Sequence, residues 1–132
     1  MKTLVCSLLV VALSGLSAIA QSAMSAEAFD AYTRGKTLSF SADGTPYGAE
    51  EYRDDRRVRW SFLDGECREG RWFPEGDAIC FVYEDDPDAQ CWRFYQTGSG
   101  LRAEFLGGDG GALYETQAAE DPLLCLGPEV GV

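Results

Sequence analysis

A chain of 132 residues is long enough for one folded domain. Its 22 acidic side chains outnumber the 11 basic ones, and the net charge of −11 argues against nucleic acid and anionic membranes as partners. The chain has no histidine, which excludes His-based catalytic triads, His-ligated haem and ordinary His–metal sites. We therefore expect a protein that is not an enzyme and that holds neither a metal nor another cofactor.

The first 20 residues are typical of a secretory signal peptide. Lys2 is the charged start, residues 4–16 are apolar, and Ala18-Ile19-Ala20 has the small-x-small form that signal peptidase accepts. A membrane anchor is the alternative, but the apolar stretch is short for a bilayer span. Cleavage after Ala20 leaves 10 basic and 22 acidic residues, a net charge of −12. We expect a periplasmic or secreted protein with no membrane span and a single domain over residues 21–132.

The first folded element is predicted to be a short helix over residues 26–34. Ser25 is a favourable N-cap residue, and Gly35 provides a left-handed stop. Phe29 and Tyr32 lie on one face of this helix. We expect this face to plug one end of the β-structure.

Strand signals then follow at short intervals, separated by tight turns rich in Gly, Pro and Asp. This pattern predicts an all-β fold, either a small antiparallel up-and-down barrel or a sandwich of about eight strands. The expected strands are residues 36–40, 48–52, 58–62, 67–73, 78–83, 91–96, 101–106 and 112–117.

The hairpin over residues 78–96 organises the predicted sheet. A turn centred between Asp85 and Asp86 places Cys80 opposite Cys91 and turns the aromatic side chains to the other face. Four cysteines follow the signal peptide, and an even number in an exported domain favours disulfides over metal binding or thiolate catalysis. Of the three possible pairings, the hairpin favours Cys80–Cys91, which leaves Cys67 to pair with Cys125.

Two further turns fix the neighbouring registers. A turn at Glu75-Gly76 places Trp72 opposite Ile79 and Gly70 opposite Phe81, whereas a turn at Gly98-Ser99 sets the next register. The second turn gives the pairs Phe94–Ala103 and Trp92–Phe105, and on the outer face it aligns Arg93 with Glu104 and Tyr95 with Arg102. The outer face also aligns Arg59 with Glu69, and such opposite charges stabilise a ladder.

Four short motifs resemble a family of small exported proteobacterial β-proteins of unknown function. They are Gly35-Lys36-Thr37, Gly70-Arg71-Trp72, Cys80-Phe81-x-Tyr83 and Cys91-Trp92. The resemblance covers roughly residues 35–105. It implies an exported β-protein and brings no catalytic residues with it.

The acidic side chains are expected to be solvated turn residues. Glu50-Glu51 and Asp54-Asp55 are adjacent pairs, whose carboxylates point apart and cannot face each other across a glycosidase-type cleft. The segment Glu84–Asp88 offers oxygen ligands for calcium but lacks the spacing and the glycine of an EF-hand loop. We therefore interpret Glu84–Asp88 as an acidic hairpin tip and expect no metal site.

The aromatic face supports two interpretations. In a barrel its side chains can line a ligand cavity, and the residues expected to do so are Trp60, Trp72, Tyr83, Trp92 and Phe94. In so small a barrel they can equally fill the interior, which is the interpretation we favour. Two functions follow as hypotheses: a module that binds a small apolar or aromatic ligand, or an acidic protein-interaction factor such as an inhibitor of a basic cell-envelope enzyme.

Overall fold

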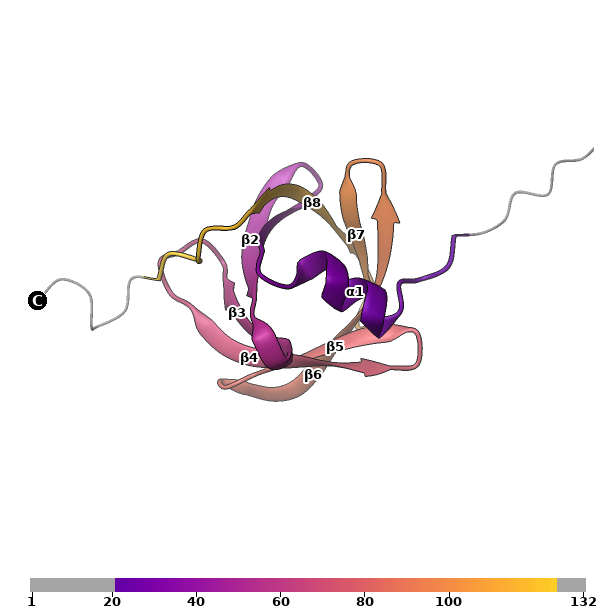
Figure 1. Ribbon diagram of the computed structural model, residues 1–132, viewed down its shortest axis with the longest axis horizontal. Coiled ribbons are helices and arrows are strands. Elements are labelled where there is room, and N and C mark those ends of the chain that lie inside the picture. The colour runs from indigo at the N-terminus through magenta and orange to yellow at the C-terminus, as the bar shows by residue number, and fades with distance from the viewer. Residues whose placement is uncertain (1–20, 126–132) are drawn as a thin grey trace, which may run out of the picture.

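The computed structural model describes residues 21–125, so the predicted signal peptide lies outside the described residues. Eight antiparallel strands each pair with the next, and β8 pairs with β1 to close a barrel (Figure 1). This confirms the predicted all-β fold and decides for the barrel over the sandwich. The elements are α1 (Ala26–Thr33), β1 (Thr37–Ala42), β2 (Thr45–Tyr52), the 3₁₀ turn η1 (Asp54–Arg56), β3 (Arg57–Ser61), β4 (Arg68–Glu75), β5 (Ala78–Tyr83), β6 (Asp86–Thr97), β7 (Gly100–Phe105) and β8 (Ala112–Ala119).

Helix α1 forms where the sequence predicts it. The Ser25 hydroxyl accepts a hydrogen bond of 3.1 Å from the backbone N–H of Ala28, which satisfies one of the free donors of the first turn. At the other end Gly35 has a φ of +79°, a left-handed conformation that glycine adopts without steric cost. The chain can therefore turn out of the helix directly into β1.

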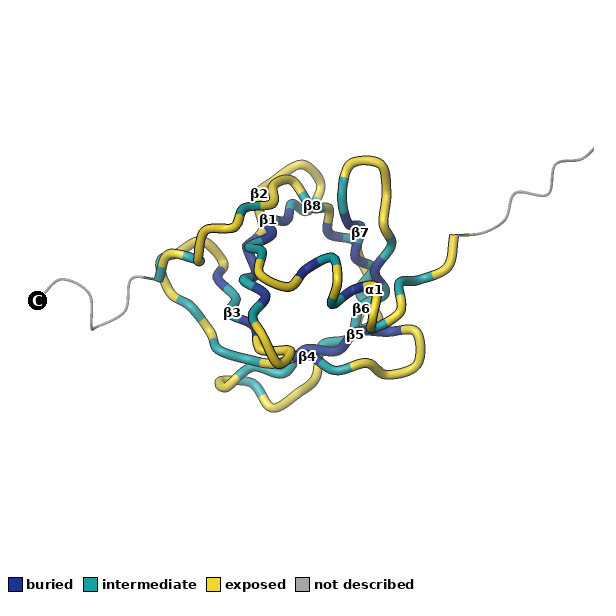
Figure 2. Tube along the Cα trace, viewed as in Figure 1, coloured by how far each residue is buried: buried dark blue, intermediate teal, exposed yellow. Residues whose placement is uncertain are grey.

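The helix lies across one end of the barrel and plugs it (Figure 1). Phe29 is fully buried, and its ring packs edge-on against the rings of Tyr52 and Trp72 at centroid distances of 5.6 and 5.1 Å. The predicted plug is thus confirmed. Figure 2 shows the buried positions along the strands and on α1, with exposed hairpin turns around them.

A hydrogen-bonded carboxylate ties the helix to the barrel wall. The Tyr32 hydroxyl donates to Glu115 on β8 over 2.9 Å, and the backbone N–H of Leu101 on β7 donates to the same oxygen over 2.7 Å. Burial and this contact with Glu115 raise the pKa of Tyr32 to about 12. Tyr32 therefore stays protonated and remains a donor throughout the physiological pH range.

The register between β6 and β7 agrees with the prediction at every pair. Trp92 lies opposite Phe105, and Phe94 lies opposite Ala103. On the outer face Arg93 is aligned with Glu104, although its guanidinium instead forms an ion pair of 2.9 Å with Asp77. The other predicted outer pairs, Tyr95–Arg102 and Arg59–Glu69, are also present, the latter as a 2.6 Å ion pair.

The predicted register between β4 and β5 is wrong by two residues. Trp72 lies opposite Phe81, and Gly70 lies opposite Tyr83. The turn consists of Gly76 and Asp77, and Gly76 has a φ of +60° at the first loop position, as in a type II′ turn. Because a shift of two keeps every side chain on its face, the inward and outward assignment survives.

The opening hairpin pairs Cys80 with Cys91 as predicted, but its turn lies one residue earlier than expected. Tyr83 lies opposite Asp86, so the two loop residues are Glu84 and Asp85, and the register shifts between Phe81 and Tyr83. The residues that bulge out of the ladder include Pro87, which has no N–H to donate.

Two disulfides, Cys80–Cys91 and Cys67–Cys125, connect the pairs that the sequence predicts. The second one fastens a C-terminal strap, residues 120–125, to the outside of the barrel. The Thr37 hydroxyl donates to the Asp121 carbonyl over 2.7 Å, and the Leu123 N–H donates to Glu51 over 3.3 Å. Two disulfides agree with an oxidising compartment. Within residues 21–125, none of the helical segments has the length and apolar character needed to cross a membrane.

The two disulfides are expected to differ in their contribution to stability. They join residues 58 and 11 positions apart, so the entropy of loop closure predicts about 4 kcal/mol for Cys67–Cys125 and about 3 kcal/mol for Cys80–Cys91. Urea unfolding of the Cys67→Ser/Cys125→Ser and Cys80→Ser/Cys91→Ser double variants measures both. A larger loss for the Cys80–Cys91 variant would contradict the entropic order.

Candidate ligand-binding site

The two ends of the barrel interior differ. The end under α1 is filled, whereas a cavity of about 60 Å³ lies in the remaining interior. Its walls come from all eight strands and are predominantly aromatic. The lining residues are Phe40, Tyr47, Glu50, Tyr52, Trp60, Phe62, Arg68, Phe81, Tyr83, Gln90, Trp92, Phe94, Ala103 and Leu113.

Four of the five residues predicted to line a cavity meet there, namely Trp60, Tyr83, Trp92 and Phe94. The fifth, Trp72, lies at the closed end, where it is 2% exposed and packs against Phe29. The two interpretations of the aromatic face therefore apply to different ends of one barrel, since one end is filled and the other is hollow.

Three aromatic side chains, Tyr47, Trp60 and Phe62, form an aromatic collar on the cavity wall. Their ring centroids are 5.4 to 5.9 Å apart, and the side chains of Tyr47 and Phe62 are 40% and 43% exposed. The Arg68 guanidinium covers the Phe62 ring at 5.1 Å and forms a 3.2 Å ion pair with Asp85. The collar leaves large apolar side chains in contact with solvent beside the cavity.

Two glycines make room for the cavity walls. A Cβ atom on Gly48 would overlap the Trp60 ring and lie 2.7 Å from the Ser61 carbonyl oxygen. A Cβ on Gly70 would lie 2.7 Å from the Tyr83 ring, its cross-strand neighbour. Each glycine thus lets a bulky aromatic side chain lie flat across the neighbouring strand.

The cavity contains one acidic side chain, Glu50 of β2, which is 2% exposed. The Tyr83 hydroxyl donates to its Oε1 atom over 2.9 Å. Its Oε2 atom is buried and has no hydrogen-bond partner among the described residues. The prediction that Glu50 is a solvated turn residue is wrong, because Glu50 lies within β2 and its side chain is buried against the cavity. The signal was the strand period of two, which places Glu50 on the same face as Tyr52.

Burial raises the pKa of the Glu50 carboxyl well above its ordinary value, and the hydrogen bond from Tyr83 offsets only part of this effect. Burial likewise raises the pKa of Tyr52 and Tyr83, and the nearby Glu50 carboxyl raises both further. The carboxyl is therefore held in its neutral form to a higher pH than a solvated glutamate. A partner that stabilises the charged form would reverse this preference.

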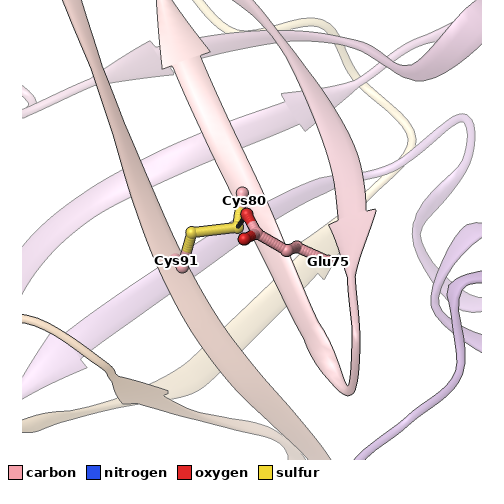
Figure 3. A group of neighbouring side chains, drawn as sticks. All are labelled: Glu75, Cys80 and Cys91. Atoms are coloured by element: carbon pink, nitrogen blue, oxygen red, sulfur yellow. Dashed lines mark hydrogen bonds between the residues drawn. A yellow bond between two sulfur atoms is a disulfide. The ribbon is translucent and has the colours of Figure 1, made fainter.

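The neighbourhood of the Cys80–Cys91 disulfide is not a metal site. Glu75 lies beside the two sulfur atoms, and together they form the one cluster of Cys, Asp and Glu ligand atoms found close together within residues 21–125 (Figure 3). The sulfurs are bonded to each other, so neither is available as a thiolate ligand. The acidic tip Glu84–Asp88 does not form such a cluster, and Asp86 instead accepts a hydrogen bond from the Asp88 N–H.

The fold and the cavity together define a closed eight-stranded β-barrel with one plugged end and one aromatic cavity. Comparison of the chain with protein-family models, with curated proteins and with solved structures gave no match.

Truncating Trp72 at the filled end and Trp60 at the hollow end should lower stability by different amounts. Trp72→Ala removes a fully packed side chain and is expected to cost roughly 3–5 kcal/mol of unfolding free energy. Trp60→Ala should cost clearly less, because the Trp60 ring already borders a cavity. Urea unfolding curves of both variants measure the difference. Equal losses would mean that the cavity is closed and packed in solution.

Replacing Glu50 should make stability less dependent on pH. Above about pH 4.3, the ordinary pKa of glutamate, the unfolded chain loses the proton while the buried carboxyl retains it, so stability falls as the pH rises. The gain in unfolding free energy for Glu50→Gln should therefore grow with pH over a range that begins at about pH 4.3. Urea unfolding at several pH values measures this gain, with Glu104→Gln on the outer face as the control. A gain that is constant over this range would contradict the assignment.

Proposed function

We propose that this protein is an exported, non-catalytic binding module that holds a small apolar or aromatic ligand in its barrel. The observation that carries the proposal is the aromatic-walled cavity at the end of the interior that α1 does not fill. Ligand sites in proteins are typically concave and apolar, with a few polar groups that fix orientation. Here Glu50, Tyr83 and Gln90 are such polar groups.

The construction of the barrel favours a preformed site. The plug by Phe29 and the two disulfides restrain the walls, and the strand ladder is closed by the β1–β8 pair. A site that is rigid before binding loses little conformational entropy when the ligand enters. This supports a binding role more than a role that requires a large rearrangement.

Export is part of the proposal. The signal-like sequence of residues 1–20 and the paired cysteines both support a periplasmic or secreted location, where disulfides persist. In such a compartment a small acidic barrel can bind its ligand outside the cytoplasm.

The alternative, an acidic factor that binds a basic envelope protein, has less support. Asp85 forms an ion pair with Arg68, and Asp86 accepts a hydrogen bond from the Asp88 N–H. Two carboxylates of the hairpin tip therefore already have partners within the chain. Steep salt dependence of binding to a basic protein would favour this alternative.

A ligand retained through purification would test the binding role directly. Native mass spectrometry of protein from the periplasm should show a mass excess over the denatured protein. The excess should be lost in Gly48→Val, in which the added side chain displaces Trp60 from the cavity wall, and retained in Gly98→Ala, where an added Cβ meets open space.

The proposal fails if two results coincide. The first is the absence of any mass excess from several growth media. The second is a tryptophan emission spectrum that does not change when small aromatic compounds are added, since Trp60 and Trp92 border the cavity.

A further inference from the structure

The free oxygen of Glu50 points to the chemistry of the ligand. A buried acceptor without a hydrogen bond is rare in folded proteins and is unfavourable, because the atom has lost its water and gained no partner. Glu50 borders the cavity, and Oε1 is already occupied by the Tyr83 hydroxyl. A ligand that donates a hydrogen bond to Oε2 would give both carboxyl oxygens of Glu50 a hydrogen-bond partner.

Among the described residues, no neighbouring positive charge balances the Glu50 carboxylate. Its directly aligned neighbours, Leu38 on β1 and Trp60 on β3, carry no charge. Tyr52 and Tyr83 are the nearby hydroxyl groups, and both remain neutral because their pKa values are raised. Among the described residues, no positively charged side chain forms an ion pair with Glu50.

Arg68 is the one basic side chain that lines the cavity, and its charge is already balanced. It pairs with Asp85 and stacks over Phe62. The chain as a whole carries a net charge of −11, which attracts cations and raises their local concentration near acidic clefts.

The aromatic walls add a second attraction for a cation. The faces of Trp, Tyr and Phe rings carry negative potential and attract ammonium groups within about 6 Å of the ring centre. The collar residues Tyr47, Trp60 and Phe62 provide such faces beside the cavity, and Trp92 provides another within it. Ammonium recognition in proteins commonly combines such rings with a carboxylate.

The size of the cavity limits what enters it. A cavity of roughly 150 Å³ accommodates benzene, whereas this one measures about 60 Å³. The enclosed space therefore suits an ammonium group on a short alkyl arm, and a larger apolar body has to remain in the collar, where Tyr47 and Phe62 are exposed.

We propose that the ligand is a small organic amine, whose ammonium group donates to Glu50 and whose apolar body lies against the aromatic collar. This inference rests on the proposed binding function and specifies its ligand class. Glu50 would act as the counter-ion, and Tyr83 would hold its carboxyl in place through Oε1.

Matched probes separate the charge of the ligand from its shape. Phenethylamine, 2-phenylethanol and 3-phenylpropionate share a phenyl ring and a two-carbon arm and end in a cation, a neutral hydroxyl and an anion. Calorimetric titration at neutral pH should show phenethylamine binding about 10- to 100-fold tighter than 2-phenylethanol, the range expected when a hydrogen bond to a charged group is added. The anion should bind weakest, because its charge disfavours ionisation of Glu50 and the negative net charge of the chain repels it.

Two variants test the assigned residues. Glu50→Gln, which keeps the shape of the side chain, should abolish the preference for the amine over 2-phenylethanol. Glu104→Gln removes an equal charge from the outer face and should leave the preference intact. Tyr47→Leu on the exposed collar keeps apolar area but removes the ring face. This variant should lower the affinity for the amine about two- to fivefold.

The outcomes distinguish the inference from the proposed function. Equal affinity for the amine and the alcohol, or a preference that survives in Glu50→Gln, would overturn the amine assignment while the cavity remains a binding site. Failure of all three probes to bind, together with no retained ligand in the native mass spectrum, would overturn both. An amine preference that is lost only in Glu50→Gln and reduced in Tyr47→Leu supports the assignment.

Discussion

Closure of the barrel by the β1–β8 pair is the constraint on which the rest of this structure depends. A closed barrel of eight strands has no free edge, and its interior is just wide enough for side chains to fill. Helix α1 supplies Phe29 to one end of that interior, whereas within residues 21–125 the other end contains the cavity. The asymmetry between a packed end and a hollow end follows from this single helix.

The same kind of residue therefore has different roles at the two ends. Trp72 packs against Phe29 and contributes to stability through its burial, whereas Trp60 borders the cavity and shapes its wall. Aromatic content alone does not distinguish these roles, since both side chains point inward from neighbouring strands. Their positions distinguish these roles, because Trp72 contacts Phe29 of the plug and Trp60 lines the cavity.

Glu50 is the feature that a packed barrel does not need. A carboxyl with one unsatisfied oxygen in an aromatic interior lowers stability, and an apolar residue at this position would avoid the cost. Natural proteins often retain such groups at binding sites, where a ligand supplies the missing partner. The cavity and the carboxyl lie together, so the proposed binding function belongs to this end of the barrel.

The sequence by itself determined the features that depend on local rules. Ser25 and Gly35 bound the helix through capping and a left-handed turn, and the period of two placed Cys80 opposite Cys91 and aligned Arg59 with Glu69. The register of Gly70 was missed by two residues, because the turn type depends on which loop position Gly76 takes. Only the tertiary structure decided the rest. The position of Trp72 depends on how the barrel meets α1, and the burial of Glu50 depends on closure of the strands around the cavity. Both involve contacts between residues far apart in the chain.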